Sequence, residues 1–486
     1  MLINIDQDVT TIPFLLSLEN KENLSDADFY PFVDEFKDTR ITDILFNINA
    51  QGSATESSFF DNYADKYLQK TENGIAVDYK NVNPVKGYYL AKYKYRVDPF
   101  AIWIKRARQI GINPWLSFRM NDCHFNNEPT SWIRDGYFYQ AKQNGLMLGK
   151  KYGYYHAAYN YRYSEIRRKF LGYIEEQLAR YDVYGIELDF MREIYCFNYI
   201  DDHDECVSIM NDFIRSVKKI VNEKEATWGH KIKIAIRLTR DIEKSLRFGF
   251  DARTFAKEGL VDIIIPSPRW QGSDSAIPIE EWKSALPNVE IFGCIETCIN
   301  ASHPRQAMMN VESALGHAAS LISRGADEIY LFNYFCGDGN RARDKELHVK
   351  LGAYEDIVKH PMRFVIIDED DDICPIGCER WVQLPIIPNP EKTVTIKTGN
   401  IPKDKTVRLI LAFDEGSPTD TEVFINGECV GTLSPCTPPD PKHSAYTDGA
   451  NCYDVKIALE SDKQNITIKN KSGKKVVISW LELDVR

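Results

Sequence analysis

The run VYGIELDFM, residues 183–191, alternates apolar and acidic side chains in a way that decides the fold. In a strand of a β-barrel, successive side chains point alternately toward the surrounding helices and toward the barrel axis. Ile186, Leu188 and Phe190 share the outward face, so Glu187 and Asp189 point inward. Asp189 is nearer the C-terminal end of the strand, where barrels of parallel strands build their active sites. The run therefore predicts one barrel strand with a functional carboxylate at its end.

Seven other apolar runs predict strands, and amphipathic helical segments separate them between residues 10 and 336. Eight parallel strands are the number that closes a barrel of this type. We therefore predict an α/β fold in which residues 1–360 form a (β/α)₈ TIM barrel, the catalytic domain. The predicted strands are 12–20, 41–49, 112–122, 183–191, 231–239, 261–268, 289–297 and 327–335.

After Pro361 the pattern changes to short alternating strands separated by Pro and Gly. This pattern is typical of an antiparallel β-sandwich. We predict a jelly-roll-like accessory domain over residues 361–486. The acidic run 368–372 is interpreted as a solvated linker rather than a cation site.

The composition of the chain argues against two classes of binding partner. The net charge is −11, and dense basic runs are missing from the sequence, which argues against nucleic-acid and anionic-membrane partners. No stretch approaches about 20 consecutive apolar residues, and the first residues lack the features of a signal peptide. We expect a cytoplasmic location, although a secreted protein trimmed of its signal peptide would look the same. The oligomeric state is left open.

The sequence lacks the common motifs of cofactor-binding proteins. No Walker loop, G-x-G-x-x-G fingerprint or G-x-S-x-G elbow follows a predicted strand. The C-x₃-C pairs Cys294/Cys298 and Cys374/Cys378 have the spacing of half a zinc site only. We therefore expect neither a cofactor nor a metal.

Asp189 and Glu296 are the candidate catalytic residues, because both end predicted strands at the catalytic rim. Two carboxylates that face each other across a pocket can cleave a glycosidic bond, one as proton donor and one as nucleophile or base. Their separation is not readable from sequence, so retention or inversion of stereochemistry stays open at this point.

Further polar residues occupy inward or rim positions and are candidates for substrate binding. Inward charge is costly unless it is paired or serves a ligand. We expect Arg119 to neutralise Glu187 on the adjacent strand, either as structural filling or as part of a ligand site. The tyrosine-rich segment 152–163 is interpreted either as a sugar-stacking surface or as a loop packed on the barrel. The candidate binding residues are Asn47, Asn49, Arg119, Asn121, Asp122, His124, Glu187, Arg192, Arg237, Trp270 and Asn333.

Three segments resemble uncharacterised glycoside-hydrolase-like barrel families that are distantly similar to the α-amylase and α-galactosidase types. The segments are SFRMNDCH (117–124), YNYRYSEIRRKFLGYIEEQLARYDVYGIELDFMRE (159–193) and GCIET (293–297). The resemblance spans about residues 10–360. It implies a glycosidase that acts on an oligo- or polysaccharide.

The resemblance also suggests roles for the two carboxylates. Relatives with an Asp in this place on the fourth strand use it as nucleophile on an α-linked sugar, which implies Asp189 as nucleophile. We therefore favour Asp189 as nucleophile and Glu296 as acid/base in a retaining reaction. Another clan places the acid on strand four after an Asn, whereas Leu188 precedes Asp189 here, so reversed roles remain the main alternative. The competing classes are a non-catalytic carbohydrate-binding barrel and a metal-assisted barrel lyase or isomerase.

Overall fold

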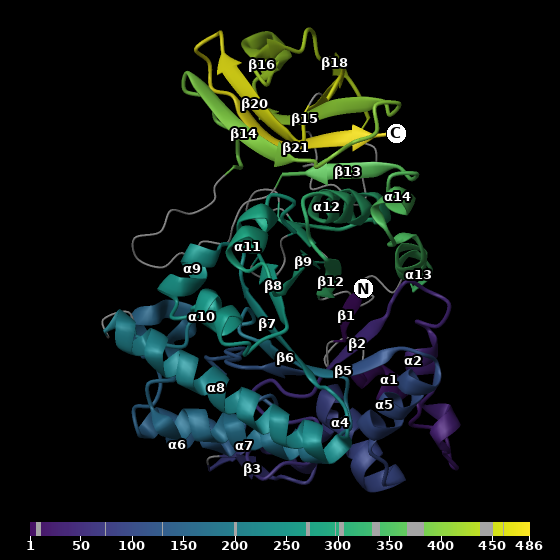
Figure 1. Ribbon diagram of the computed structural model, residues 1–486, viewed down its shortest axis with the longest axis vertical. Coiled ribbons are helices and arrows are strands. Elements are labelled where there is room, and N and C mark those ends of the chain that lie inside the picture. The colour runs from purple at the N-terminus through teal and green to yellow at the C-terminus, as the bar shows by residue number, and fades with distance from the viewer. Residues whose placement is uncertain are drawn as a thin grey trace.

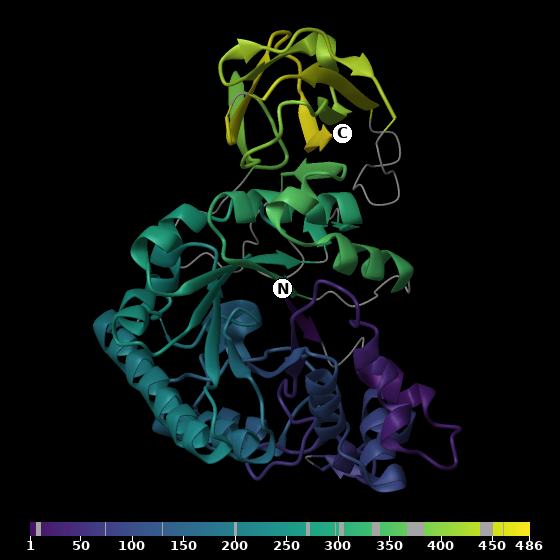
Figure 2. The same cartoon turned by 45° about the vertical axis from the view of Figure 1, so that its right-hand side comes forward.

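A computed structural model of the chain shows a closed eight-stranded barrel below a smaller β domain (Figures 1 and 2). The structure describes residues 1–486 apart from 6–10, 73, 129, 199–201, 269–272, 297, 301–305, 333–340, 367–382, 438–450 and 460. The barrel strands are all parallel and follow the order β1-β12-β9-β8-β7-β6-β5-β2. They are β1 Leu2–Ile5, β2 Asp43–Asn47, β5 Asn113–Arg119, β6 Gly185–Asp189, β7 Lys233–Thr239, β8 Ile263–Ser267, β9 Glu290–Glu296 and β12 Glu328–Phe332.

The predicted barrel is confirmed, but its first strand was placed wrongly. Residues 12–20 do not form a strand: Ile12–Ser17 is helix α1, and the first strand is β1. Pro13 occupies the first turn of α1, and the buried Ile12 and Leu15 are three residues apart. That spacing fits one face of a helix, and a short apolar run does not by itself separate a buried strand from a buried helix.

Helices surround the barrel on its outside (Figures 1 and 2). The longest, α8, begins after Asp202, whose carboxylate accepts hydrogen bonds from the first-turn amides, and ends at Gly229 with φ of 76°. The other helices are α2 Pro31–Asp34, α3 Tyr63–Lys66, α4 Asn83–Tyr89, α5 Pro99–Gln109, α6 Gly136–Gln143, α7 Ser164–Arg180, α9 Ile242–Arg247, α10 Ala252–Lys257, α11 Ile279–Ala285, α12 Val311–Ser323, α13 Arg341–Lys350 and α14 Tyr354–Ile357, with α8 at His203–Trp228. Among the described residues, none of the helices combines the length and apolar character needed to cross a membrane.

The barrel interior holds an apolar cluster together with buried charged residues. The cluster includes Leu2, Leu45 and Trp115 and extends to Phe332 at the end of β12. Further along the same inward faces lie Glu187 and Arg237, both fully buried. The predicted inward parity of Glu187 and Arg237 is therefore confirmed.

The C-terminal region is a two-sheet antiparallel sandwich, as predicted. One sheet has the order β13-β21-β15-β19-β18 and the other β14-β20-β16-β17. The strands are β13 Met362–Val365, β14 Glu391–Lys397, β15 Val407–Glu415, β16 Thr421–Ile425, β17 Glu428–Cys429, β18 Ser434–Pro435, β19 Asn451–Ile457, β20 Lys463–Asn470 and β21 Val477–Val485. Two short antiparallel pairs, β3 Thr71–Glu72 with β4 Ile75–Ala76 and β10 Cys298–Asn300 with β11 Gln306–Met308, complete the described strands.

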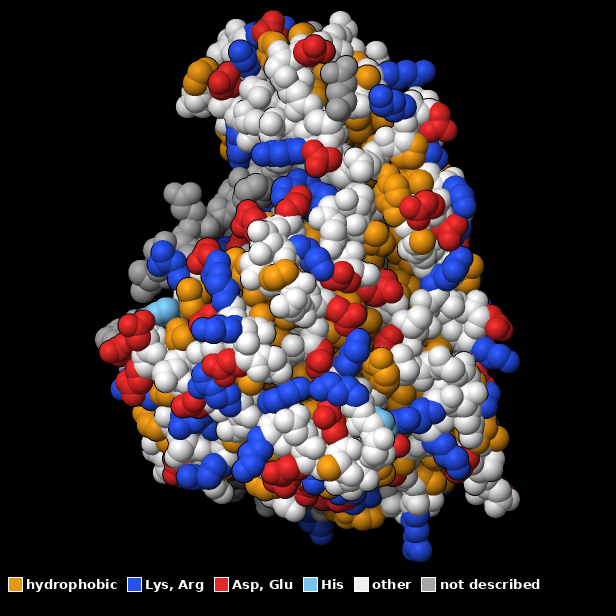
Figure 3. All heavy atoms as spheres, in the orientation of Figure 1, with side chains coloured by type: hydrophobic (Ala, Val, Ile, Leu, Met, Phe, Trp, Pro, Cys, Tyr) orange, Lys and Arg blue, Asp and Glu red, His pale blue; other side chains and the backbone are white. Residues whose placement is uncertain are grey.

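Helix α12 packs directly under β13, which joins the barrel to the sandwich (Figure 2). A Cβ at Gly316 would lie 2.3 Å from the carbonyl oxygen of Arg363. Only glycine permits this close approach of helix and strand. The Arg363 side chain forms a fully buried ion pair with Glu482 of β21. On the face in Figure 3, acidic and basic side chains are interspersed over the barrel and the sandwich.

Candidate functional site

The Asp189 carboxylate at the end of β6 is held by a buried arginine from the next strand. Arg237 Nε donates to Asp189 Oδ1 at 2.9 Å, and Nη2 donates to Oδ2 at 3.1 Å. The backbone N–H of Arg192 also donates to Oδ1, at 2.9 Å. The two side chains are 0% and 1% exposed, so the pair is shielded from solvent. Asp189 is thereby fixed in orientation and neutralised by a permanent cation.

The third nitrogen of the Arg237 guanidinium, Nη1, is not bonded to Asp189. Its guanidinium carbon lies 3.5 Å from the ring centroid of Phe332. Burial alone lowers the pKa of Arg237, but the Asp189 charge outweighs burial and raises it overall. Among the described residues, the buried Nη1 has no hydrogen-bond partner. A buried N–H group without an acceptor destabilises the folded protein, so a hydrogen-bond acceptor on a bound ligand would satisfy Nη1.

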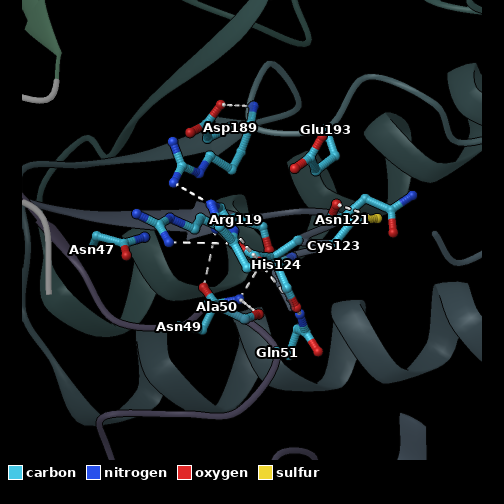
Figure 4. A network of polar contacts seen from close by, with 12 residues as sticks. Asn47, Asn49, Ala50, Gln51, Arg119, Asn121, Cys123, His124, Asp189 and Glu193 are labelled. Carbon is cyan, nitrogen blue, oxygen red and sulfur yellow. Dashed lines mark hydrogen bonds and ion pairs between the residues drawn. The ribbon is translucent and has the colours of Figure 1, made fainter. Parts of the chain in front are cut away.

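A second charged network lies at the ends of β5 and β6. Asp122 accepts from the backbone N–H of His124 at 2.9 Å, and His124 Nδ1 lies 2.9 Å from both Asp122 oxygens. His124 Nε2 lies 2.7 Å from Arg192 Nη2. Arg119 Nη1 contacts Asp122 Oδ2 at 3.3 Å. Figure 4 shows Asp189, Arg119 and His124 gathered within one small region.

The chemistry of this network determines the tautomer of His124. A guanidinium only donates, so His124 Nε2 must accept from Arg192, and the ring proton sits on Nδ1 and is donated to Asp122. Burial, followed by the charge of Arg192, lowers the pKa of His124 although Asp122 opposes the shift. Burial raises the pKa of Asp122, but His124 and the nearby arginines lower it well below its usual range. Asp122 is therefore ionised, which makes it unsuitable as a proton donor.

The expected Arg119–Glu187 pair is wrong. Tyr330 Oη donates to Glu187 Oε1 at 2.5 Å, and Asn4 Nδ2 donates to Oε2 at 3.1 Å. Register explains the difference, because Glu187 lies level with Ser117 on β5, whereas Arg119 lies level with Asp189. Burial and then the charge of Asp189 raise the pKa of Glu187 to about 7.

We expect the raised pKa of Glu187 to make stability depend on pH. The folded state binds the proton more tightly than the unfolded state, so the stabilisation is complete below pH 4.5 and is lost as pH rises to about 7. Over this window the wild type should lose about 3 kcal/mol relative to Glu187→Gln. Urea denaturation of both proteins at pH 5 and pH 8 measures the difference. The exposed Glu422→Gln variant is the control, and parallel pH profiles for wild type and Glu187→Gln would contradict the assignment.

Glu296 is the last residue of β9 and lies on the inward face that also carries Phe292 and Cys294. It is fully buried. Its backbone N–H donates to Ser273 Oγ at 2.8 Å, and Ser273 Oγ donates back to the Glu296 carbonyl at 2.6 Å. The hydroxyl thus clamps the end of the strand. Glu296 therefore lies at the same end of the barrel as Asp189, as its position at the end of the predicted strand indicates.

The side chains of the predicted asparagines mainly form hydrogen bonds with the backbone of neighbouring segments. Asn49 Nδ2 donates to the Arg119 carbonyl at 2.9 Å, and the Arg119 N–H donates to Asn49 Oδ1 at 3.1 Å. Asn121 Nδ2 donates to the carbonyls of Tyr195 and Tyr159 at 2.8 and 3.0 Å. Asn47 Nδ2 contacts the Ser117 carbonyl at 3.3 Å. Their substrate-binding role stays a prediction.

The tyrosine-rich segment is largely packed against the barrel. Tyr155 stacks on Tyr195 with centroids 4.1 Å apart, and Tyr159 and Tyr161 are buried. These rings are not available for stacking on a sugar. Trp270 and Asn333, the remaining predicted binding residues, lie outside the described residues.

Glu193 is a candidate that the sequence analysis did not identify. It follows β6 by four residues, is fully buried, and accepts from Tyr154 Oη at 3.0 Å. Gln51 is a second such residue, and its Nε2 lies 3.3 Å from Asp122 Oδ1. The signal for Glu193 was its place in DFMRE, directly beyond the end of the strand that carries Asp189. Within the described ranges, no cluster of three or more His, Cys, Asp or Glu residues suitable for a metal is present.

Comparison with known proteins finds no matching family model and no matching curated protein. The chain resembles the solved α-L-fucosidase isoenzyme 2 from Paenibacillus thiaminolyticus, at 11% identity and a TM-score of 0.41, over 73% of this chain and 49% of that one. The chain thus spans about half the length of that fucosidase. The chitinase ChiW from Paenibacillus sp. str. FPU-7 gives 8% identity and a TM-score of 0.42, over 74% and 32%.

The PgaB (BpsB) glycoside hydrolase domain from Bordetella bronchiseptica gives 10% identity and a TM-score of 0.41, over 73% of this chain and 99% of that domain. These structural neighbours are glycoside hydrolases. Similarity at this level carries no argument about the reaction, so the chemistry has to be derived from the residues themselves.

Proposed function

We propose that this chain is a glycoside hydrolase that acts on an oligo- or polysaccharide with retention of configuration, and that Asp189 is its nucleophile. The observation that carries the proposal is the buried Asp189–Arg237 pair at the C-terminal end of the barrel. A nucleophilic carboxylate has to be held in a fixed orientation, and the two hydrogen bonds from Arg237 do this.

The contacts of Asp189 leave an oxygen able to attack. Oδ1 accepts two hydrogen bonds, from Arg237 and from the Arg192 amide, whereas Oδ2 accepts one, from Arg237 Nη2. Since a carboxylate oxygen has two lone pairs, Oδ2 keeps one for the anomeric carbon. The free Arg237 Nη1 can at the same time donate to a sugar hydroxyl.

The proposed proton donor is Glu296, which ends its strand on the inward face at the same end of the barrel. In the first step it protonates the leaving oxygen while Asp189 forms the glycosyl-enzyme bond, and in the second it takes a proton from the attacking water. Glu193 is the alternative donor, because it is equally buried beside the strand that carries Asp189. Asp122 is excluded from this role by its lowered pKa.

Hydrolysis of 4-nitrophenyl glycosides and of glycans with unactivated leaving groups tests the proposal. Glu296→Gln is expected to lower kcat/KM on unactivated glycans at least about 100-fold more than on aryl glycosides, because only poor leaving groups need the proton. Glu193→Gln is the matched control. If Glu193→Gln shows the selective loss instead, the donor role moves to Glu193.

The stereochemistry of the first product, followed by proton NMR, tests the retaining mechanism separately. Retention supports attack by Asp189, and inversion would make Asp189 a base that activates water. If sugars bind but no panel substrate is cleaved by the wild type, the chain is a carbohydrate-binding barrel.

A further inference from the structure

Two cysteines lie opposite each other at one edge of the sandwich, far along the chain from the barrel site. Strands β18 and β19 pair in antiparallel register, with Pro435 opposite Tyr453. One residue further along, the N–H of Cys436 donates to the carbonyl of Cys452 at 2.9 Å. The pairing therefore continues to these two residues.

We propose that Cys436 and Cys452 are a modification site that forms a cross-strand disulfide. Directly opposite residues of an antiparallel pair share a face of the sheet, with Cα atoms about 4.5–5.5 Å apart. A disulfide spans Cα separations of about 4.4–6.8 Å, so no rearrangement of the strands is needed. Both residues are free thiols in the structure, with Cys436 half-buried and Cys452 buried.

The position of the pair explains what the bond would do. β18 is the edge strand of its sheet and contains only Ser434 and Pro435. Proline has no N–H to donate to the ladder, so β18 is held by few hydrogen bonds. A bond between Cys436 and Cys452 would tie this edge to β19 and close a covalent ring over residues 436–452. Such a ring restricts the unfolded chain and stabilises the folded domain.

The oxidation is a thiol–disulfide exchange with a small-molecule disulfide such as glutathione disulfide. The more accessible Cys436 sulfur attacks the small disulfide, breaks its S–S bond and releases one thiol, which takes up the Cys436 proton. Cys452 then attacks Cys436 Sγ, forms the Sγ–Sγ bond and releases the second small thiol with the Cys452 proton. Two protein thiols lose two electrons, and one small disulfide gains them.

The surroundings make this exchange slow near neutral pH. Burial, followed by the charge of Asp454, raises the pKa of Cys436 to about 11, although Arg408 opposes the shift. Burial and then Cys436 itself raise the pKa of Cys452 to about 12, with Glu482 adding to it. Because the thiolate is the attacking form, the rate of closure should rise about tenfold per pH unit below these pKa values.

The test uses the full chain, incubated at pH 8.5 in glutathione buffers of graded redox ratio and then alkylated and mapped without reduction. We expect a peptide cross-linked between Cys436 and Cys452 with the mass of two hydrogens lost, and a sandwich Tm raised by several degrees. Cys436→Ser should lose both effects. Cys429→Ser, which removes the exposed thiol on β17, should keep them.

Three outcomes would overturn the proposal. The first is alkylation of both residues after incubation in the most oxidising buffer. The second is glutathione adducts on Cys436 or Cys452 that do not proceed to the cross-link. The third is a cross-link from either residue to another cysteine.

Discussion

Asp189→Asn is expected to lower kcat/KM at least about 10³-fold while the barrel stays folded. The amide keeps the volume of the carboxylate and can still accept from Arg237 Nε and the Arg192 amide, but it has no negative charge for the anomeric carbon. It also leaves Arg237 without a counter-charge, so the Tm should fall. Activity is therefore compared well below the Tm, with circular dichroism to confirm folding.

A matched control separates lost chemistry from lost stability. Asp135 forms another buried ion pair, with Lys169 at 2.6 Å, and caps the N-terminus of α6. Asp135→Asn should lower the Tm and leave kcat/KM close to that of the wild type. Substantial turnover by Asp189→Asn on the true substrate would remove Asp189 from the nucleophile role.

Arg237→Met is expected to destabilise the barrel by about 3–5 kcal/mol, because it leaves Asp189 as an uncompensated buried charge. Chemical denaturation followed by tryptophan fluorescence measures the loss.

The double variant Asp189→Asn/Arg237→Met supplies the comparison. It removes both charges, so it should be more stable than Arg237→Met alone, and the non-additivity measures the coupling of the pair. A Tm for Arg237→Met within about one degree of the wild type would show that the pair contributes little.

The sequence determined the features of this protein that depend on local periodicity. Alternation along 183–191 placed Glu187 and Asp189 inside the barrel, and seven of the eight strands fall where the apolar runs predicted. The change of pattern near Pro361 likewise predicted the sandwich. Side-chain direction in a strand has a period of two residues, so a single strand is enough to decide which face a residue occupies.

The tertiary structure alone decided which inward residues meet. Parity puts a side chain inside the barrel, but the register between strands sets its height along the axis. That register places Asp189 level with Arg119 on one side and Arg237 on the other, and Glu187 level with Ser117 and Ala235. Glu187 therefore has no arginine at its own level, and it accepts hydrogen bonds from Tyr330 on β12 and Asn4 on β1. Asp189 instead forms the ion pair with Arg237. Register depends on how all eight strands close into one barrel, a property that no single stretch of sequence contains.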